Sequence, residues 1–447
     1  MVKDKNEPAL RRVKAVGLSC FGFMNKEDFE WVSAVDLRIG HFVELDLGWM
    51  AHPFPSGSFK VSSEKQLETI RGLGLERVRT VPSKSDPAPA VSQAPAKPVT
   101  SQVEQSPAEQ KRKARAELLA AQNSSLLACE RRFGDSVRQY RKAIDLVQSN
   151  PAGAAELCNA MVHGFVSEMM HEGESAIRLL TETAGDRASM HPVNVTVVSL
   201  LLGKAMGLDH HTLVDLGLAA FLHDIGKIHI HERVRSLEDG FSTAQYKLYQ
   251  EHVGQSVTVA KEMQLSALAI QTIAQHHELA DGSGFPARIP SAAMSPAARI
   301  LSLVNRYDNL CNPPKAGAAM TPHEALALMY AQQKSRFDPL VLSAFIRMMG
   351  VYPPGSVVQL VDERYAMVVS VNSSRPLKPR VIVFDSGVAK HEALILDLER
   401  SPNIGIRRSL KPTSLPTAAL DYLAPRQRIC YFFENAGSPA KEETAAA

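Results

Sequence analysis

Histidines are concentrated in one part of this chain: of the 15 in the sequence, nine lie between His191 and His277. Two adjacent pairs stand out, His223-Asp224 in "AAFLHDIGKIHIH" and His276-His277 in "ALAIQTIAQHHELADGSGFP". Imidazole together with carboxylate suits Fe and Mn first, with Zn and Ni as alternatives, and a site with an open position activates water. The pattern therefore predicts a centre of two divalent metals that performs hydrolysis.

Helices are expected to position these side chains. His223-Asp224 ends the apolar helix "TLVDLGLAAFLHD", which Gly226 can terminate. His252 lies inside a helix that opens with a capping box, and His191 precedes the apolar run "VNVTVVSLLL". Adjacent side chains diverge by roughly 100° on a helix, so each member of a pair can face a different metal. No Ser-His-Asp or Cys-His arrangement and no Gly-x-Ser-x-Gly turn offers a rival chemistry.

Composition excludes several other classes of protein. The chain has 50 basic and 47 acidic residues, and a net charge of +3 gives no reason to expect a DNA-binding surface. Its five cysteines are scattered without CxxC spacing, which favours a reducing compartment. No segment approaches the roughly 18 apolar residues of a membrane span, and the N-terminus lacks a signal-peptide core. We expect a cytoplasmic protein.

The chain is predicted to be mainly α, with small β-containing regions at both ends. Patterns of periodicity, caps and Pro/Ala/Ser-rich composition divide it in sequence order. The predicted parts are a small α+β domain at 1–81, a disordered linker at 82–110, a helical lead-in at 111–185, a helical metal-binding domain at 186–350, a small antiparallel β domain at 351–435 and a disordered tail at 436–447.

Two motifs resemble a known family. "HDIGK" at 223–227 is the metal motif of the HD superfamily, and "HHELADGSGFP" at 276–286 resembles the HD-GYP signature HHExxDGxGYP. The resemblance spans roughly residues 187–348. The N-terminal region is similar to a domain of unknown function that often precedes HD-GYP domains.

The resemblance implies an all-helical HD bundle that hydrolyses cyclic di-GMP to pGpG and possibly on to GMP, through a metal-activated hydroxide. Asp224 and Lys227 would be the catalytic residues, the lysine reaching a phosphate oxygen. The first metal would take His191, His223 and Asp224. The second metal would take the carboxylate shared with the first and three imidazoles, namely Asp224, His252, His276 and His277.

The resemblance also implies which residues contact the substrate and which partners are expected. Cyclic di-GMP itself is the first partner, and the family's Gly-Tyr-Pro loop has been linked to GGDEF-domain proteins. A homodimer is a further expectation. The predicted substrate-binding residues are Lys227, Asp281, Gly284, Phe285, Pro286 and Lys315.

Two departures from the family pattern affect the expected activity. "RILSLVNRYDNL" places Asn305 where the family has its last aspartate ligand, and an amide oxygen binds a divalent ion more weakly than a carboxylate. Asp308, three residues later, is a possible substitute ligand. The family's basic stretch is replaced by "CNPPKAG", which leaves Lys315 as the nearby cation.

Three functions remain open at this stage. The first is a metal-dependent cyclic di-GMP phosphodiesterase with reduced activity. The second is a cyclic di-GMP-binding sensor or interaction protein with little or no catalysis, which Asn305 favours. The third is an HD hydrolase of another nucleotide.

Overall fold

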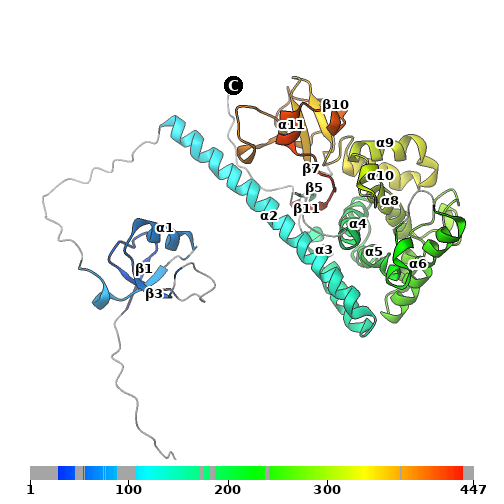
Figure 1. Cartoon of the computed structure of the whole chain (residues 1–447), viewed down its shortest axis with the longest axis horizontal. Coiled ribbons are helices and arrows are strands. Elements are labelled where there is room, and N and C mark those ends of the chain that lie inside the picture. The colour runs from blue at the N-terminus through cyan, green and yellow to red at the C-terminus, as the bar shows by residue number, and fades with distance from the viewer. Residues whose placement is uncertain are drawn as a thin grey trace, which may run out of the picture. The chain divides into compact units, whose positions relative to one another are not determined.

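The computed structural model describes residues 29–45, 54, 56–73, 75, 77–87, 106–171, 175–181, 187–236, 241–372 and 375–435. The chain separates into two compact units, residues 1–104 and residues 105–447 (Figure 1). The predicted tail at 436–447 and residues 88–105 of the predicted linker lie outside the described residues. Within the described part of the chain, no helix is both long and apolar enough to cross a membrane.

The N-terminal unit is a small α+β fold, as predicted. Four antiparallel strands in the order β1-β4-β2-β3 pair with one another, and the Ser63 side chain caps the helix by accepting from the Gln66 amide. Val43, Ile70 and their neighbours form its apolar core. Its elements are β1 (Glu30–Ser33), β2 (Phe42–Glu44), β3 (Ser58–Lys60), α1 (Glu64–Gly72) and β4 (Arg77–Thr80).

The second unit begins with two long helices, α2 (Pro107–Val147) and α3 (Pro151–His171). A capping box between Ser106 and Glu109 starts α2, so the last four residues of the segment predicted to be linker, 107–110, are helical. Phe133 and other buried side chains of α2 and α3 join the main core.

Seven further helices build the bundle that carries the histidines. The Ser242–Gln245 capping box forms at the start of α6, as the sequence predicts. The helix α5 is buried from Leu213 to Leu222, which explains why its sequence is apolar on every face. The helices are α4 (Arg187–Ala205), α5 (His210–Leu222), α6 (Thr243–Glu262), α7 (Ala267–Ala274), α8 (Pro296–Cys311), α9 (Pro322–Gln332) and α10 (Pro339–Met349).

The C-terminal strands form an antiparallel sheet that includes a strand from the region predicted to be helical throughout. The strand β5 pairs with β7 and with β11, and all five of its residues are buried. The prediction of helix up to residue 185 is therefore wrong here, because pairing on both edges outweighs local propensity. The elements are β5 (Ser175–Leu179), β6 (Val357–Leu360), β7 (Tyr365–Asn372), β8 (Arg380–Val383), β9 (Ile395–Asp397), β10 (Ile406–Leu410), α11 (Thr417–Leu423) and β11 (Tyr431–Asn435).

The helices and the sheet share one apolar core. Val357 and Met367 face the helices, whereas their neighbours Val358 and Val368 belong to a smaller cluster on the other face of the sheet. This alternation is what a half-covered antiparallel sheet requires. The division of 111–435 into three domains stays a prediction, since the described parts pack as one unit.

Candidate metal centre

Four helices of the bundle bring the predicted histidines together. His191 comes from α4, and His252 from the middle of α6. The pair His223-Asp224 follows the last residue of α5, and the pair His276-His277 follows the end of α7.

Asp224 lies between two clusters of imidazoles. Its Oδ2 is 3.4 Å from Nε2 of His223 and 3.7 Å from Nε2 of His191. Its Oδ1 is 3.4 Å from Nε2 of His252 and 3.8 Å from Nε2 of His276. One carboxylate oxygen therefore faces each cluster.

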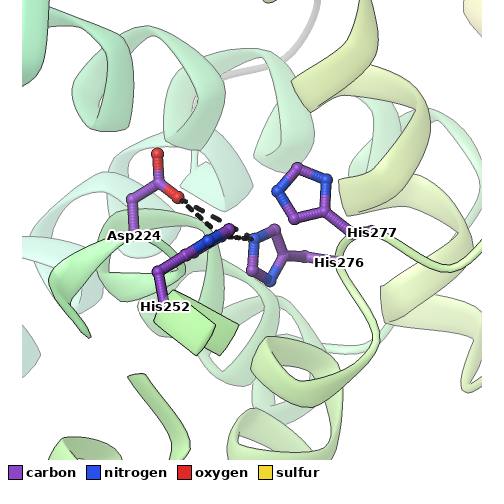
Figure 2. Close-up of side chains that lie close together, drawn as sticks. All are labelled: Asp224, His252, His276 and His277. Carbon is purple, nitrogen blue, oxygen red and sulfur yellow. Dashed lines mark hydrogen bonds and ion pairs between the residues drawn. The ribbon is translucent and has the colours of Figure 1, made fainter. Parts of the chain in front are cut away.

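The second cluster is shown in Figure 2. Its four potential ligand atoms lie within 4.8 Å of one another, as do those of the first cluster. The His277 ring stacks on Phe285 with centroids 4.5 Å apart, and its Nε2 lies 3.3 Å from the Tyr249 hydroxyl. The members of this cluster are Asp224, His252, His276 and His277.

Backbone carbonyls orient three of the rings in the same way. Nδ1–H of His223, His252 and His276 donates to the carbonyl oxygen three residues earlier, at 2.8, 2.5 and 2.7 Å respectively. Because a carbonyl only accepts, the proton is on Nδ1 and the lone pair is on Nε2. That lone pair faces Asp224, which is the arrangement a metal ligand needs.

His191 is oriented by a carboxylate instead. Its Nδ1 lies 2.5 Å from Oδ2 of Asp308, while its Nε2 lies 3.2 Å from Nε2 of His223. Asp308 thus contacts the ring nitrogen that faces away from the first cluster. The idea that Asp308 substitutes for the missing ligand is wrong, because Asp308 orients His191 through the nitrogen that does not face the cluster.

Burial favours the neutral form of four of these imidazoles. It lowers the pKa of His276 and His277 well below the usual histidine value, and the neighbouring imidazoles lower it further. It lowers the pKa of His252 to about 4 and also lowers that of His191, where the hydrogen bond to Asp308 opposes the shift. Neutral imidazoles at neutral pH are the form that binds a cation.

The Asp224 carboxylate is ionised and incompletely satisfied. Burial raises its pKa, but the charge of Lys227 and the contact with His223 outweigh burial and hold the pKa well below the ordinary value. Lys227 Nζ lies 2.5 Å from Oδ2, whereas the buried Oδ1 has no hydrogen-bond partner. A buried anionic oxygen that is surrounded by imidazole nitrogens fits a divalent cation, so these residues suit metal binding.

A cavity of about 490 Å³ opens beside the second cluster. His276 and His277 form part of its wall. Five of the residues predicted from the sequence also line it, namely Lys227, Gly284, Phe285, Asn305 and Lys315.

Two predicted substrate contacts lie elsewhere. Asp281 and Pro286 are exposed and are not among the residues that line the cavity. Asp281 instead stabilises the turn at residues 281–283, since its Oδ1 accepts from the amide and the hydroxyl of Ser283. Substrate contact by these two residues is therefore not supported by their positions.

Glu278 is a residue of the second motif whose role the sequence did not reveal. Its side chain is fully buried, and its carboxylate accepts hydrogen bonds from the amides of Ala287, Arg288 and Ile289. These bonds hold the loop that carries Phe285 against His277. The signal in the sequence that could have indicated this role is the position of Glu278 directly after the histidine pair.

Two arginines of the cavity wall were also missed. Arg306 of α8 and Arg336 both line the cavity, and neither has a carboxylate within 4 Å among the described residues. Burial and the charge of Arg336 lower the pKa of Arg306. Two neighbouring guanidinium groups without ion-pair partners make this part of the wall suited to an anion.

Asn305 is buried in α8 and lines the same cavity. Its amide oxygen accepts a hydrogen bond of 2.7 Å from Nδ2 of Asn309. That oxygen keeps one lone pair for another partner, without the charge that an aspartate would bring.

Comparison with known sequences gives two matching domains. Residues 174–341 match the HD domain, and residues 32–158 match a domain of unknown function, DUF3391. The two matches lie in the order that the motifs predict.

Individual proteins are similar to different lengths of this chain. The cyclic di-GMP phosphodiesterase PA4108 of Pseudomonas aeruginosa is 28% identical over 365 residues, which cover 80% of this chain and 86% of that protein. The 3'3'-cGAMP-specific phosphodiesterase 3 of Vibrio cholerae is 24% identical over 163 residues, which cover 36% of this chain and 35% of that protein. The solved structure of Bd1817, an HDG"Y"P protein from Bdellovibrio bacteriovorus, is 15% identical with a TM-score of 0.40, covering 71% of this chain and 98% of that one.

Proposed function

We propose that this chain, which has a DUF3391 domain before its HD domain, is a metal-dependent phosphodiesterase of cyclic di-GMP of the HD-GYP type. The observation that carries the proposal is the pair of clusters that share Asp224. Its buried Oδ1 has no hydrogen-bond partner, and the cavity beside it is large enough for a nucleotide.

The residues around this centre have separate roles in the proposed reaction. Divalent metals would lower the pKa of a bound water, which could then attack the phosphodiester, and would neutralise negative charge on its phosphate. The first would be held by His191, His223 and Asp224, and the second by Asp224 with His252, His276 and His277. Lys227, which already lies 2.5 Å from Asp224, is placed to pair with an oxygen of a phosphate held at the same point.

Aromatic side chains in the cavity wall suit the bases of a dinucleotide. Tyr246 and Tyr249, one turn apart on α6, line the cavity together with Phe285. The ring centroid of Tyr246 is 5.9 Å from that of Phe285 and 6.4 Å from that of Tyr249. Stacking on such rings accepts any base, so these residues support a dinucleotide without selecting guanine over adenine. Contacts with GGDEF-domain proteins and a homodimer stay predictions from the resemblance.

The test is a turnover assay on the full chain loaded with Mn²⁺ or Fe²⁺. We expect cyclic di-GMP to be converted to pGpG or GMP, and cyclic GMP-AMP to be cleaved more slowly. Preferential cleavage of cyclic GMP-AMP would replace the proposed substrate and keep the reaction class. Metal-loaded protein that binds cyclic di-GMP and never cleaves it would establish the sensor function. In that case the Asn305→Asp variant shows whether the missing charge is the reason.

A further prediction concerns the two guanidinium groups of the cavity wall. A cyclic dinucleotide has two phosphates, and we propose that Arg306 and Arg336 hold the one that is not on the metals. Replacing either with alanine is expected to raise KM about ten-fold and leave kcat and metal content unchanged, since a charge-assisted hydrogen bond contributes about 1.5–3 kcal/mol. Steady-state kinetics measure this split.

Lys334→Ala is the matched control for the arginine variants. Lys334 belongs to the same short helical turn as Arg336 and is exposed, but it is not among the residues that line the cavity. Its KM should stay at the wild-type value. Equal KM values for all three variants would show that the guanidinium groups do not hold the substrate.

A further inference from the structure

A chain of buried hydrogen bonds continues from the metal centre behind His191. Asp308 accepts a hydrogen bond from His191 through Oδ2, at 2.5 Å. Its other oxygen, Oδ1, accepts from the side-chain amides of Asn194 on α4 and of Asn312 at the end of α8, the latter at 2.9 Å. The carboxylate that orients His191 is thus held by two amides from different helices.

The same two amides also bind the main chain just before and at the start of β11. Oδ1 of Asn194 accepts from the Tyr431 amide at 2.8 Å, and Oδ1 of Asn312 accepts from the Ile429 amide at 2.8 Å. Both Nδ2 groups donate to the Ile429 carbonyl, Asn312 at 2.8 Å and Asn194 at 3.3 Å. We call Asn194, Asp308, Asn312 and the main chain of 429–431 the C-terminal clamp.

Except at the half-buried Asn312, water has little access to the clamp. Asp308 is 2% exposed, Asn194 3% and Ile429 4%. Without the amide of Asn312, Oδ1 of Asp308 would keep only the donor from Asn194, in a site that solvent does not readily reach. The position of the carboxylate therefore depends on the amides, and their position depends on the C-terminal strand.

The strand itself is anchored on its other side. The Tyr431 hydroxyl donates to the Pro354 carbonyl at 3.0 Å and lies 3.0 Å from the Tyr307 hydroxyl. Residue 431 is therefore tied both to α8 and to the segment that leads into β6. A strand more than 230 residues after His191 in sequence is rigidly connected to it.

We propose that the C-terminal clamp positions His191, so that the affinity of the first metal site depends on residues 429–431. The inference rests on the proposed metal centre, and it adds a role for the C-terminal sheet. Among the described residues, the clamp makes no hydrogen bond or ion pair with His252, His276 or His277. Its loss should therefore weaken one metal site and spare the other.

The test is a Mn²⁺ titration of the full chain by equilibrium dialysis with metal analysis. Wild type should bind two equivalents. Asn312→Ala should bind one of them roughly ten- to a hundred-fold more weakly and the other unchanged, as for other residues that support a metal ligand. Asn159→Ala is the matched control, because Asn159 is also a half-buried asparagine whose amide donates to a carbonyl, that of Ala155, at 2.9 Å.

A second variant covers the case in which Asn312→Ala does not fold. Asp308→Asn keeps the shape of the side chain and removes the negative charge that faces His191. It should weaken binding of the same single equivalent of Mn²⁺. Two wild-type affinities in either folded variant would overturn the clamp and leave the proposed function standing. Wild-type protein that binds no Mn²⁺ would overturn the metal centre itself, so the two failures are distinguishable.

Discussion

Asp224→Asn is expected to remove metal from both clusters and to lower kcat/KM roughly a thousand-fold or more, as loss of one member of a catalytic unit does. Asp224 presents Oδ2 to His191 and His223 and Oδ1 to His252 and His276. An amide would offer one uncharged oxygen and turn an N–H₂ group toward the other cluster. Metal analysis and turnover of cyclic di-GMP measure the two losses.

Asp215→Asn is the matched control for this variant. Asp215 is a buried carboxylate on α5, the helix that ends just before Asp224, and its Oδ1 accepts a hydrogen bond of 2.6 Å from the Ser266 hydroxyl. It belongs to neither cluster, so the variant should keep its metal and its turnover. Retention of two metals by Asp224→Asn would contradict the bridging position of this carboxylate.

Gly226→Ala is expected to disrupt the site severely. A Cβ at residue 226 would lie 2.3 Å from the Ser256 amide nitrogen and 2.4 Å from the His252 carbonyl oxygen. Both atoms are backbone of α6 and cannot turn away, so the turn after Asp224 must move and separate it from His252. We expect a loss of about 2 kcal/mol or more in the free energy of unfolding, which is typical of overpacking, together with loss of metal. Denaturant titration and metal analysis give both values.

Gly254→Ala, on the helix α6 that Gly226 packs against, is expected to have the opposite effect on stability. A Cβ at residue 254, which is exposed on α6, would have no atom within 4 Å. Replacing a helical glycine with alanine there should stabilise the protein by about 0.5–1 kcal/mol. Similar stabilities for the two variants would show that α6 and the turn after Asp224 do not pack as closely as described.

This contrast corrects one expectation about Gly226. The sequence suggested that it ends the preceding helix, but α5 already ends at Leu222, and Gly226 is not among the described glycines with a positive φ, such as Gly282 at 76°. Gly226 lies in a short helical turn, Ile225–His229, and its amide donates to the Ser256 hydroxyl at 2.9 Å. The glycine is needed for close packing against α6, which a local pattern does not reveal.

The sequence by itself determined several helix starts and the residues that could bind metal. Capping boxes such as that of Ser242 and Gln245 specify helix starts through contacts three residues apart. The pairs His223-Asp224 and His276-His277 could be recognised because their members are adjacent in the chain. Such signals are local, so a single sequence contains them in full.

Only the tertiary structure decided how these residues are supported. The role of Asp308, the entry of β5 into the C-terminal sheet and the cavity-lining position of Arg306 all depend on segments that are distant in sequence. The bond from the Tyr431 amide to Asn194 spans 237 residues. Contacts of this kind follow from the packing of the whole core, because many different partners satisfy the same local pattern and only one arrangement buries them all.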